Sequence, residues 1–193
     1  MGFGLGIRIV KRLLLSLPIV LLAVVSAAAQ GGNDDSALST ISNTGHAVVS
    51  VDRAMKPALD GAGVDTPITV MAVRDQKQFV RFASKDRGLC FGVRNPDAAH
   101  FAFTCWNDFP SRAHPILDES PFGAETGEPL HILGLQGFAA DGVAAIDLTD
   151  AAGVMLTRVP VTGNVYNLQA PPPSTVRLVA VDAAGKTLFS VPR

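Results

Sequence analysis

The two cysteines of the chain, Cys90 and Cys105, limit its folding more than any other feature. Residues 89–93 and 101–105 alternate between apolar and small or polar side chains, as strands do, and residues 95–98 between them are rich in turn formers. A hairpin centred within that stretch places the two cysteines directly opposite each other, at a separation that suits a disulfide. We therefore predict an antiparallel hairpin closed by a Cys90–Cys105 bridge, which adds about 3 kcal/mol of stability in the chain-entropy model.

Two other uses of the cysteines stay open, a free thiol nucleophile and a metal site shared with His100 and His114. Structural zinc sites usually take their ligands in close pairs such as C-x2-C, and the sequence has no such pair. A catalytic thiol needs a lowered pKa, which a sequence does not reveal. The disulfide is the favoured interpretation, and we predict no metal site and no cofactor.

The first 29 residues have the organisation of an export signal. The basic start contains Arg8, Lys11 and Arg12, and an uncharged apolar block follows at residues 13–25. Ala27 and Ala29 then form a small-residue cleavage motif before Gln30. The alternative is an uncleaved membrane anchor. The apolar block is short for a bilayer-spanning helix of about 20 residues, and Pro18 interrupts it. We expect cleavage before Gln30 and an extracytoplasmic or secreted protein, with a membrane-anchored protein as the alternative.

The charge balance argues against two classes of partner. Without residues 1–29, 13 basic side chains remain against 17 acidic ones. A mildly acidic protein is a poor ligand for nucleic acid or for an anionic membrane surface. Contact with a membrane is therefore expected only if the N-terminal segment is retained.

The distribution of Gly, Pro and apolar residues predicts a mainly β fold in several parts. A short helix is expected over residues 49–59. Strands are expected at 69–73, 78–84, 89–94 and 101–106, and then at 130–139, 143–149, 154–161, 165–169, 176–182 and 187–191. The corresponding organisation is a flexible leader at 30–45, a disulfide-stapled β domain at 46–109, a Pro- and Gly-rich connector at 110–129 and a small sandwich at 130–193.

The four residues Asp-Ala-Ala-Gly occur twice in the last part, at 150–153 and 182–185, each time between two apolar strands. Asp at the first position of a type I turn accepts hydrogen bonds from the backbone amides that follow. Gly at the fourth position adopts the positive φ that closes a hairpin with a bulge. Both sequences therefore predict hairpin turns.

Three segments of the last part, residues 137–143, 159–166 and 179–185, resemble a terminal module of many uncharacterised exported bacterial proteins. The module is similar to immunoglobulin-like or carboxypeptidase-regulatory-like β-sandwiches, and residues 109–118 resemble the segment that precedes it. The resemblance implies a small sandwich. It implies no activity, and no catalytic residues are carried over from it.

The sequence contains none of the familiar catalytic or nucleotide-binding motifs, and we predict no catalytic residue. The best candidate for a binding surface is Trp106 with Phe109, which could stack on a sugar ring or anchor a peptide. The alternative is that both rings fill the contact between the two halves. A hydrolase site would have to use dispersed residues such as His114, Asp118 and Ser120.

The function expected from these features is that of an exported, non-enzymatic β-protein which interacts with another protein or with the cell envelope. The alternatives are a secreted hydrolase with its site in the connector and the extracytoplasmic sensor domain of an anchored protein.

Overall fold

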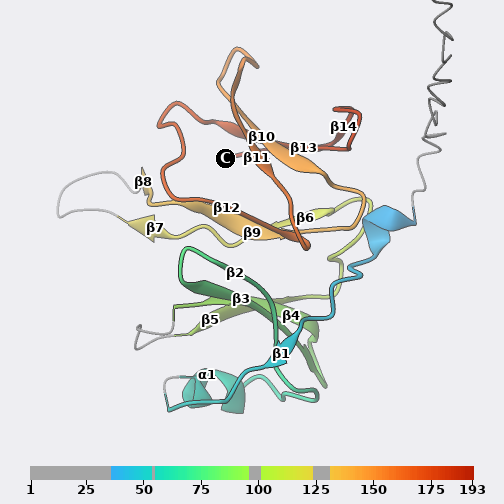
Figure 1. The fold of residues 1–193 in the computed structure, drawn as a ribbon, viewed down its shortest axis with the longest axis vertical. Coiled ribbons are helices and arrows are strands. Elements are labelled where there is room, and N and C mark those ends of the chain that lie inside the picture. Colours follow the sequence, from blue (N-terminus) through green and yellow to red (C-terminus); the bar gives the residue numbers. More distant parts are fainter. Residues whose placement is uncertain (1–35, 54, 96–100, 124–130) are drawn as a thin grey trace, which may run out of the picture. The chain divides into compact units, whose positions relative to one another are not determined.

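Antiparallel strands build the protein, and the only α-helix in the described part of the chain, α1, spans Lys56–Asp60 (Figure 1). The computed structural model describes residues 36–53, 55–95, 101–123 and 131–193. Residues 1–29, with Ala27 and Ala29, and the following Gln30 lie outside the described residues. No helix within the described ranges has the length and apolar character needed to cross a membrane.

The first sheet has five strands in sequence order, and each is antiparallel to its neighbours. They are β1 (Ala47–Val48), β2 (Thr69–Arg74), β3 (Lys77–Ser84), β4 (Gly88–Arg94) and β5 (Ala102–Trp106). The last four match the expected strands to within one residue. Cys90 lies opposite Cys105 in the β4–β5 register, and a disulfide joins them, which confirms the predicted pairing.

Seven further strands form two sheets with the character of a β-sandwich. The three-stranded sheet has the order β12 (Val165–Leu168), β9 (Leu135–Ala139), β6 (Ile116–Asp118). The four-stranded sheet has the order β11 (Met155–Pro160), β10 (Ala145–Thr149), β13 (Arg177–Val181), β14 (Thr187–Pro192). A separate short ribbon pairs β7 (Phe122–Gly123) with β8 (His131–Ile132).

The sequence pattern missed β6, which lies within the expected connector at 110–129. The strand has only three residues, within the five that separate Pro115 from Pro121, and so short a segment shows no readable alternation. The strand forms because β9 lies beside it and supplies backbone partners, with Ile116 opposite Ala139 and Asp118 opposite Gly137.

Three apolar cores separate the layers, which Figure 1 shows one above another as α1, the five-stranded sheet, the three-stranded sheet and the four-stranded sheet. The outer core, below the five-stranded sheet, includes Leu59, Phe82, Cys90 and Phe101. The central core, between the five- and three-stranded sheets, consists of Met71, Phe79, Phe91, Phe109, Leu117, Phe138 and Val165. The sandwich core, between the last two sheets, includes Leu135, Ile146, Leu148, Tyr166 and Leu178.

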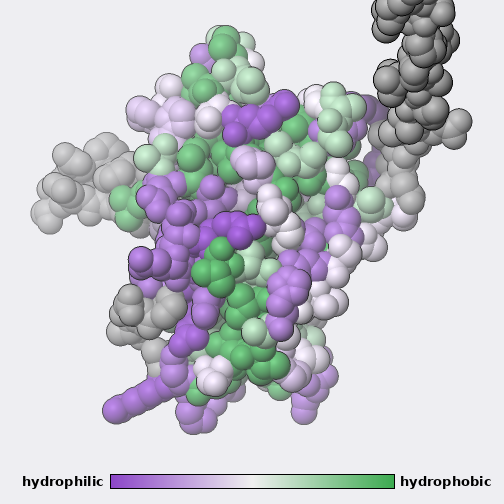
Figure 2. All heavy atoms as spheres, in the orientation of Figure 1, coloured by the Kyte–Doolittle hydropathy of each residue, from purple (hydrophilic) through white to green (hydrophobic). Residues whose placement is uncertain are grey.

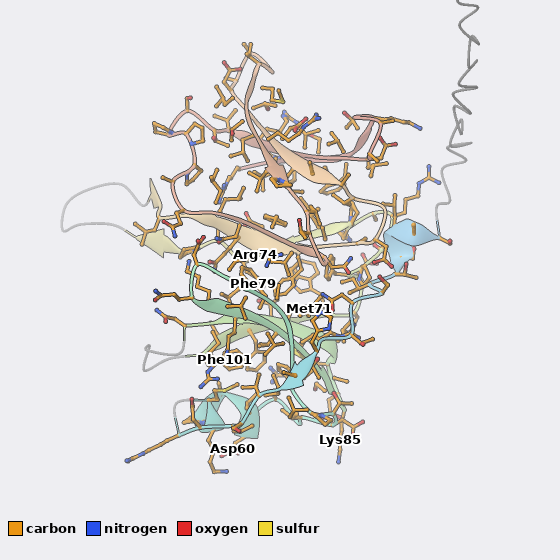
Figure 3. The ribbon with its side chains drawn as sticks, in the orientation of Figure 1. Asp60, Met71, Arg74, Phe79, Lys85 and Phe101 are labelled. Carbon is orange, nitrogen blue, oxygen red and sulfur yellow. A yellow bond between two sulfur atoms is a disulfide. The ribbon has the colours of Figure 1, made fainter. Side chains whose placement is uncertain are left out.

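In Figure 3, the labelled Met71 and Phe79 belong to the side of the five-stranded sheet that meets the three-stranded sheet, and the labelled Phe101 to the side that meets α1. Strands of the three-stranded sheet also bury both of their faces. All five residues of β9 are buried, because this strand contributes to the central core and to the sandwich core. The middle position of the sheet explains why this strand lacks a solvent-facing row of polar residues.

Both Asp-Ala-Ala-Gly sequences form the predicted turns. The Asp150 carboxylate accepts hydrogen bonds from the amides of Ala152 and Val154, each at 2.9 Å. Asp182 accepts the equivalent pair at the same distances. Gly153 has a φ of 81°, and the β10–β11 register shifts beside the turn, as expected for a bulge.

Residues 36–45 do not behave as the expected flexible leader. Leu38 is buried in the sandwich core, and the Asp141 carboxylate accepts hydrogen bonds from the Thr40 hydroxyl and from the amide and hydroxyl of Ser42. Asn164 donates to the same carboxylate at 2.9 Å. A short polar segment looks like a linker in the sequence, because the acceptor that docks it lies about a hundred residues away.

The helix is shorter than the one expected over residues 49–59. It begins at Lys56 because Pro57 has no amide hydrogen to donate and is tolerated only in the first turn of a helix. Val49 lies outside the helix, and its amide donates to the carbonyl of Ile68. The division into a domain at 46–109 and another at 130–193 stays a prediction.

We predict that Gly153→Ala lowers the free energy of unfolding by about 1 kcal/mol, because alanine is strained at a positive φ. Urea denaturation measures the loss. A Cβ at position 153 meets no atom within 4 Å, so sterics add nothing. Gly61→Ala is the matched control: its φ is −83° and its surroundings are equally open, so it should be neutral or slightly stabilising. Equal losses in both variants would contradict this explanation.

We also predict that the stabilising effect of Asp141 disappears in acid. Burial raises the pKa of this carboxyl, but the hydrogen bonds from Ser42, Asn164 and Thr40 outweigh that effect and leave the pKa below its ordinary value. The contribution is complete above the ordinary pKa and is lost as the pH falls through the lower folded-state pKa. Wild type should therefore exceed Asp141→Asn in thermal stability at neutral pH, and the gap should close at low pH. A gap that is independent of pH would contradict the prediction.

Candidate functional site

The structure separates the two residues of the predicted binding surface. Phe109 is only 3% exposed, and its ring centroid lies 5.1 Å from that of Phe91 in an edge-to-face contact. It belongs to the central core and is excluded from any surface. Trp106, at the end of β5, is 41% exposed. Of the pair, only Trp106 is available to a ligand.

The indole ring of Trp106 lies close to the imidazole ring of His114. The ring centroids of Trp106 and His114 are 6.0 Å apart, and His114 also faces Phe189 at 6.5 Å. Nδ1 of His114 lies 2.6 Å from a carboxylate oxygen of Asp108. These contacts restrict the orientation of the indole while leaving part of it in solvent.

A cleft of about 470 Å³ has Trp106 in its lining and takes residues from the edges of two sheets. β5 ends the five-stranded sheet and β6 ends the three-stranded sheet. The cleft is lined by Val93, Ala102, Thr104, Trp106, Leu117, Asp118, Glu119, Ser120, Pro121 and Gln136. Its volume is in the range of small-molecule sites, and it combines apolar walls with a few polar groups, as such sites do.

The polar groups of the cleft form a connected network. Asp118 accepts hydrogen bonds from the hydroxyl and the amide of Ser120, and the Ser120 hydroxyl accepts one from the Gln136 amide at 3.2 Å. The Gln136 side chain donates to the Glu119 carbonyl at 2.9 Å and accepts from Nζ of Lys77 at 2.8 Å. The network holds the wall from residue 118 to 120 in place.

A buried guanidinium lies behind Asp118. Nη2 of Arg193 is 3.7 Å from the Asp118 carboxylate, and the arginine side chain is only 5% exposed. Within the described residues, its three guanidinium nitrogens have no hydrogen-bond partner. A buried cation without hydrogen bonds is costly, and the nearest compensation is the negative charge of Asp118.

Glu119 has a raised pKa. Burial disfavours its ionised form, and the neighbouring Asp118 raises the pKa further, although a hydrogen bond with Thr104 opposes both effects. Because Thr104 lies on β5 and Glu119 follows β6, this contact connects the two walls of the cleft. Below the cleft, the buried Tyr166 hydroxyl donates to the Leu117 carbonyl at 3.1 Å, and burial holds the pKa of that phenol well above its ordinary value.

The residues considered for a hydrolase do not form a catalytic unit. His114 pairs with Asp108, whereas Asp118 and Ser120 pair with each other. A serine nucleophile needs a base within hydrogen-bond reach, and no hydrogen bond joins Ser120 to His114 in the part of the chain that the structure describes. Nor do the described ranges contain a group of three metal-ligating side chains.

A second cavity, of about 310 Å³, lies on the five-stranded sheet near β1. It is lined mostly by apolar and Thr side chains, and its one charged residue, Arg81, donates to the carbonyl of Asn43. Figure 2 shows apolar residues reaching the surface over this sheet, and the exposed residues there include Val48 and Val73. This cavity lacks the varied polar groups of the first.

Sequence reasoning missed Thr104, Gln136 and Arg193. Gln136 is a polar residue in an otherwise apolar strand, and this contrast was a usable signal. The sequence indicates Glu119, with Glu125 and Glu128, only as a weak cation site or, more simply, as a solvated carboxylate, and the structure places Glu119 in the lining of the cleft. Arg193 gave no signal, because only the tertiary structure brings it beside Asp118.

We predict losses of stability of very different size for the two aromatic residues. Phe109→Ala should lower the free energy of unfolding by about 3–5 kcal/mol, because it leaves a cavity in the central core. Trp106→Ala should cost about 1 kcal/mol or less, because the indole is partly exposed. Urea unfolding followed by circular dichroism measures both. A larger loss for Trp106→Ala would place the indole in the core.

The comparisons with known proteins add no assignment: no family model matches the chain, and neither a curated protein nor a solved structure is significantly similar to it.

Proposed function

We propose that the protein is an exported, non-enzymatic binding module that contacts a protein or an envelope component through the cleft beside Trp106. The observation that carries this proposal is a partly exposed indole in the lining of a cleft of about 470 Å³, on a strand that a disulfide joins to its neighbour. A rigid support lowers the entropic cost of binding, because the contact residues are already ordered.

The disulfide supports the extracytoplasmic location. Such bonds persist in oxidising compartments and are rare where thiols are kept reduced. Cys90 is fully buried, and the described residues contain no free cysteine, so the pair has a structural role. Export itself depends on residues 1–29, which supply the signal-like pattern.

An immunoglobulin-like sandwich at the C-terminal end is part of the proposal. Its support is the division of seven strands into sheets of three and four, with the hairpins β10–β11 and β13–β14 both in the larger sheet. Immunoglobulin-type domains divide seven strands between two sheets in the same numbers. That fold serves many functions, so the site must carry the functional argument.

The hydrogen bonds of the Ser120 hydroxyl favour a binding role over hydrolysis. The Ser120 hydroxyl donates to Asp118 and accepts from the Gln136 amide, so its hydrogen bonds hold the cleft wall. A nucleophile instead needs a neighbouring base that removes its proton.

The test of location uses the full chain expressed in an exporting bacterium. We expect the mature protein outside the cytoplasm to begin at Gln30 and to contain no free thiol, as read by mass spectrometry before and after reduction. A protein that keeps Met1 and two free thiols inside the cell would contradict export.

The test of binding compares wild type with Trp106→Ala in sedimentation with isolated cell envelopes. We expect wild type to sediment and the variant to stay in solution, with Met155→Ala as the matched control because Met155 is an exposed apolar residue outside the cleft. Equal sedimentation of wild type and Trp106→Ala would exclude this cleft as the binding site.

A further inference from the structure

The walls of the cleft differ in chemistry, and this difference restricts what it can bind. On the β5 side the lining includes the partly exposed Trp106 and Thr104, whose side chain shares a hydrogen bond with Glu119. On the opposite side stand the carboxyl groups of Asp118 and Glu119 with the Ser120 hydroxyl. A ligand that fits must have an apolar face for the indole and hydroxyl or amide hydrogens for the oxygens.

The charges around the cleft are balanced by the protein itself. The buried Arg193 guanidinium lies 3.7 Å from Asp118 and has no hydrogen-bonding partner of its own in the described residues. Burial disfavours the ionised form of Glu119, and Lys77 donates to Gln136. A cationic ligand would have to compete with Arg193 for Asp118, whereas a neutral one would not.

A planar aromatic ligand would pack on Trp106 but would offer no hydrogen-bond donors to the carboxyl and hydroxyl oxygens of the opposite wall. Buried or partly buried acceptors that lose water and gain no hydrogen bond are penalised. A ring that carries hydroxyl groups satisfies both walls, because its C–H face packs on the indole while its hydroxyls donate to the carboxyl oxygens.

We propose that the cleft binds a neutral saccharide, with one sugar ring stacked on Trp106 and its hydroxyls hydrogen-bonded to Asp118 and Glu119. This proposal rests on the proposed binding function and specifies its ligand class. Asp118 is the fixed acceptor, because Ser120 and Arg193 hold it from two sides. Glu119 accepts when ionised and also donates when protonated.

The experiment uses the mature protein obtained by export of the full chain, and it measures the fluorescence of the protein's own tryptophan. Trp106 is the only tryptophan, so intrinsic fluorescence reports on the cleft alone. The probes are neutral tetrasaccharides of glucose, N-acetylglucosamine, mannose and galactose, used up to about 10 mM so that a millimolar Kd is detected. Tetralysine is the cationic probe.

We expect at least one tetrasaccharide to shift the emission to shorter wavelength in a saturable way, while tetralysine does not. By calorimetry, Trp106→Ala should weaken binding by about tenfold or more, and Trp106→Phe should retain part of it because a ring face remains. Glu119→Gln should change the affinity by less than about threefold, because the amide still forms hydrogen bonds. Met155→Ala should bind as wild type does.

Two results would overturn the saccharide assignment. One is no response to any tetrasaccharide; the other is binding of tetralysine that Glu119→Gln abolishes. In either case, loss of envelope sedimentation in Trp106→Ala would leave the binding function intact and change only its ligand. If that variant also sediments as wild type does, the binding function fails as well.

Discussion

The contact on which the rest of the structure depends is the packing of phenylalanine rings between the five-stranded and three-stranded sheets. Phe138 of β9 meets Phe79 and Phe91 at ring-centroid distances of 5.7 and 4.9 Å, and Phe109 completes the group against Phe91. These rings join the two sheets face to face. Without this contact, neither the position of β6 nor the cleft at its edge would be defined, because both lie beside the central core.

The cleft lies where the five-stranded and three-stranded sheets end. β5 and β6 are edge strands, and the central core between their sheets includes Leu117 of β6 but no residue of β5. Edge strands expose unpaired backbone groups, which natural proteins usually protect with turns, charges or covering segments. Here charged and polar residues from 118 to 120 border the opening, and the disulfide holds β5 against β4. A stable gap with a polar wall is a suitable place to hold a small polar ligand.

Local signals in the sequence were sufficient for most strands and for both turns. The apolar residues within 78–84 and 89–94 identified strands, and the structure explains them because each strand supplies residues to the central core on one face and to the outer core on the other. The Asp-Ala-Ala-Gly turns were predictable because their hydrogen bonds lie within five residues. Features that depend on residues far apart in the chain were not predicted. The docking of residues 40–42 on Asp141 and the strand β6 depend on partners elsewhere in the chain.

The sequence by itself determined the mainly β architecture, the Cys90–Cys105 pairing and the two hairpin turns, since each depends on residues close together in the chain. Tertiary structure alone decided which aromatic residue is exposed and which polar groups share a site. Phe109 and Trp106 are three residues apart, yet one fills the central core and the other borders the cleft. The reason is physical: burial and charge balance depend on neighbours across the sheets, and a pattern along one strand does not specify those neighbours.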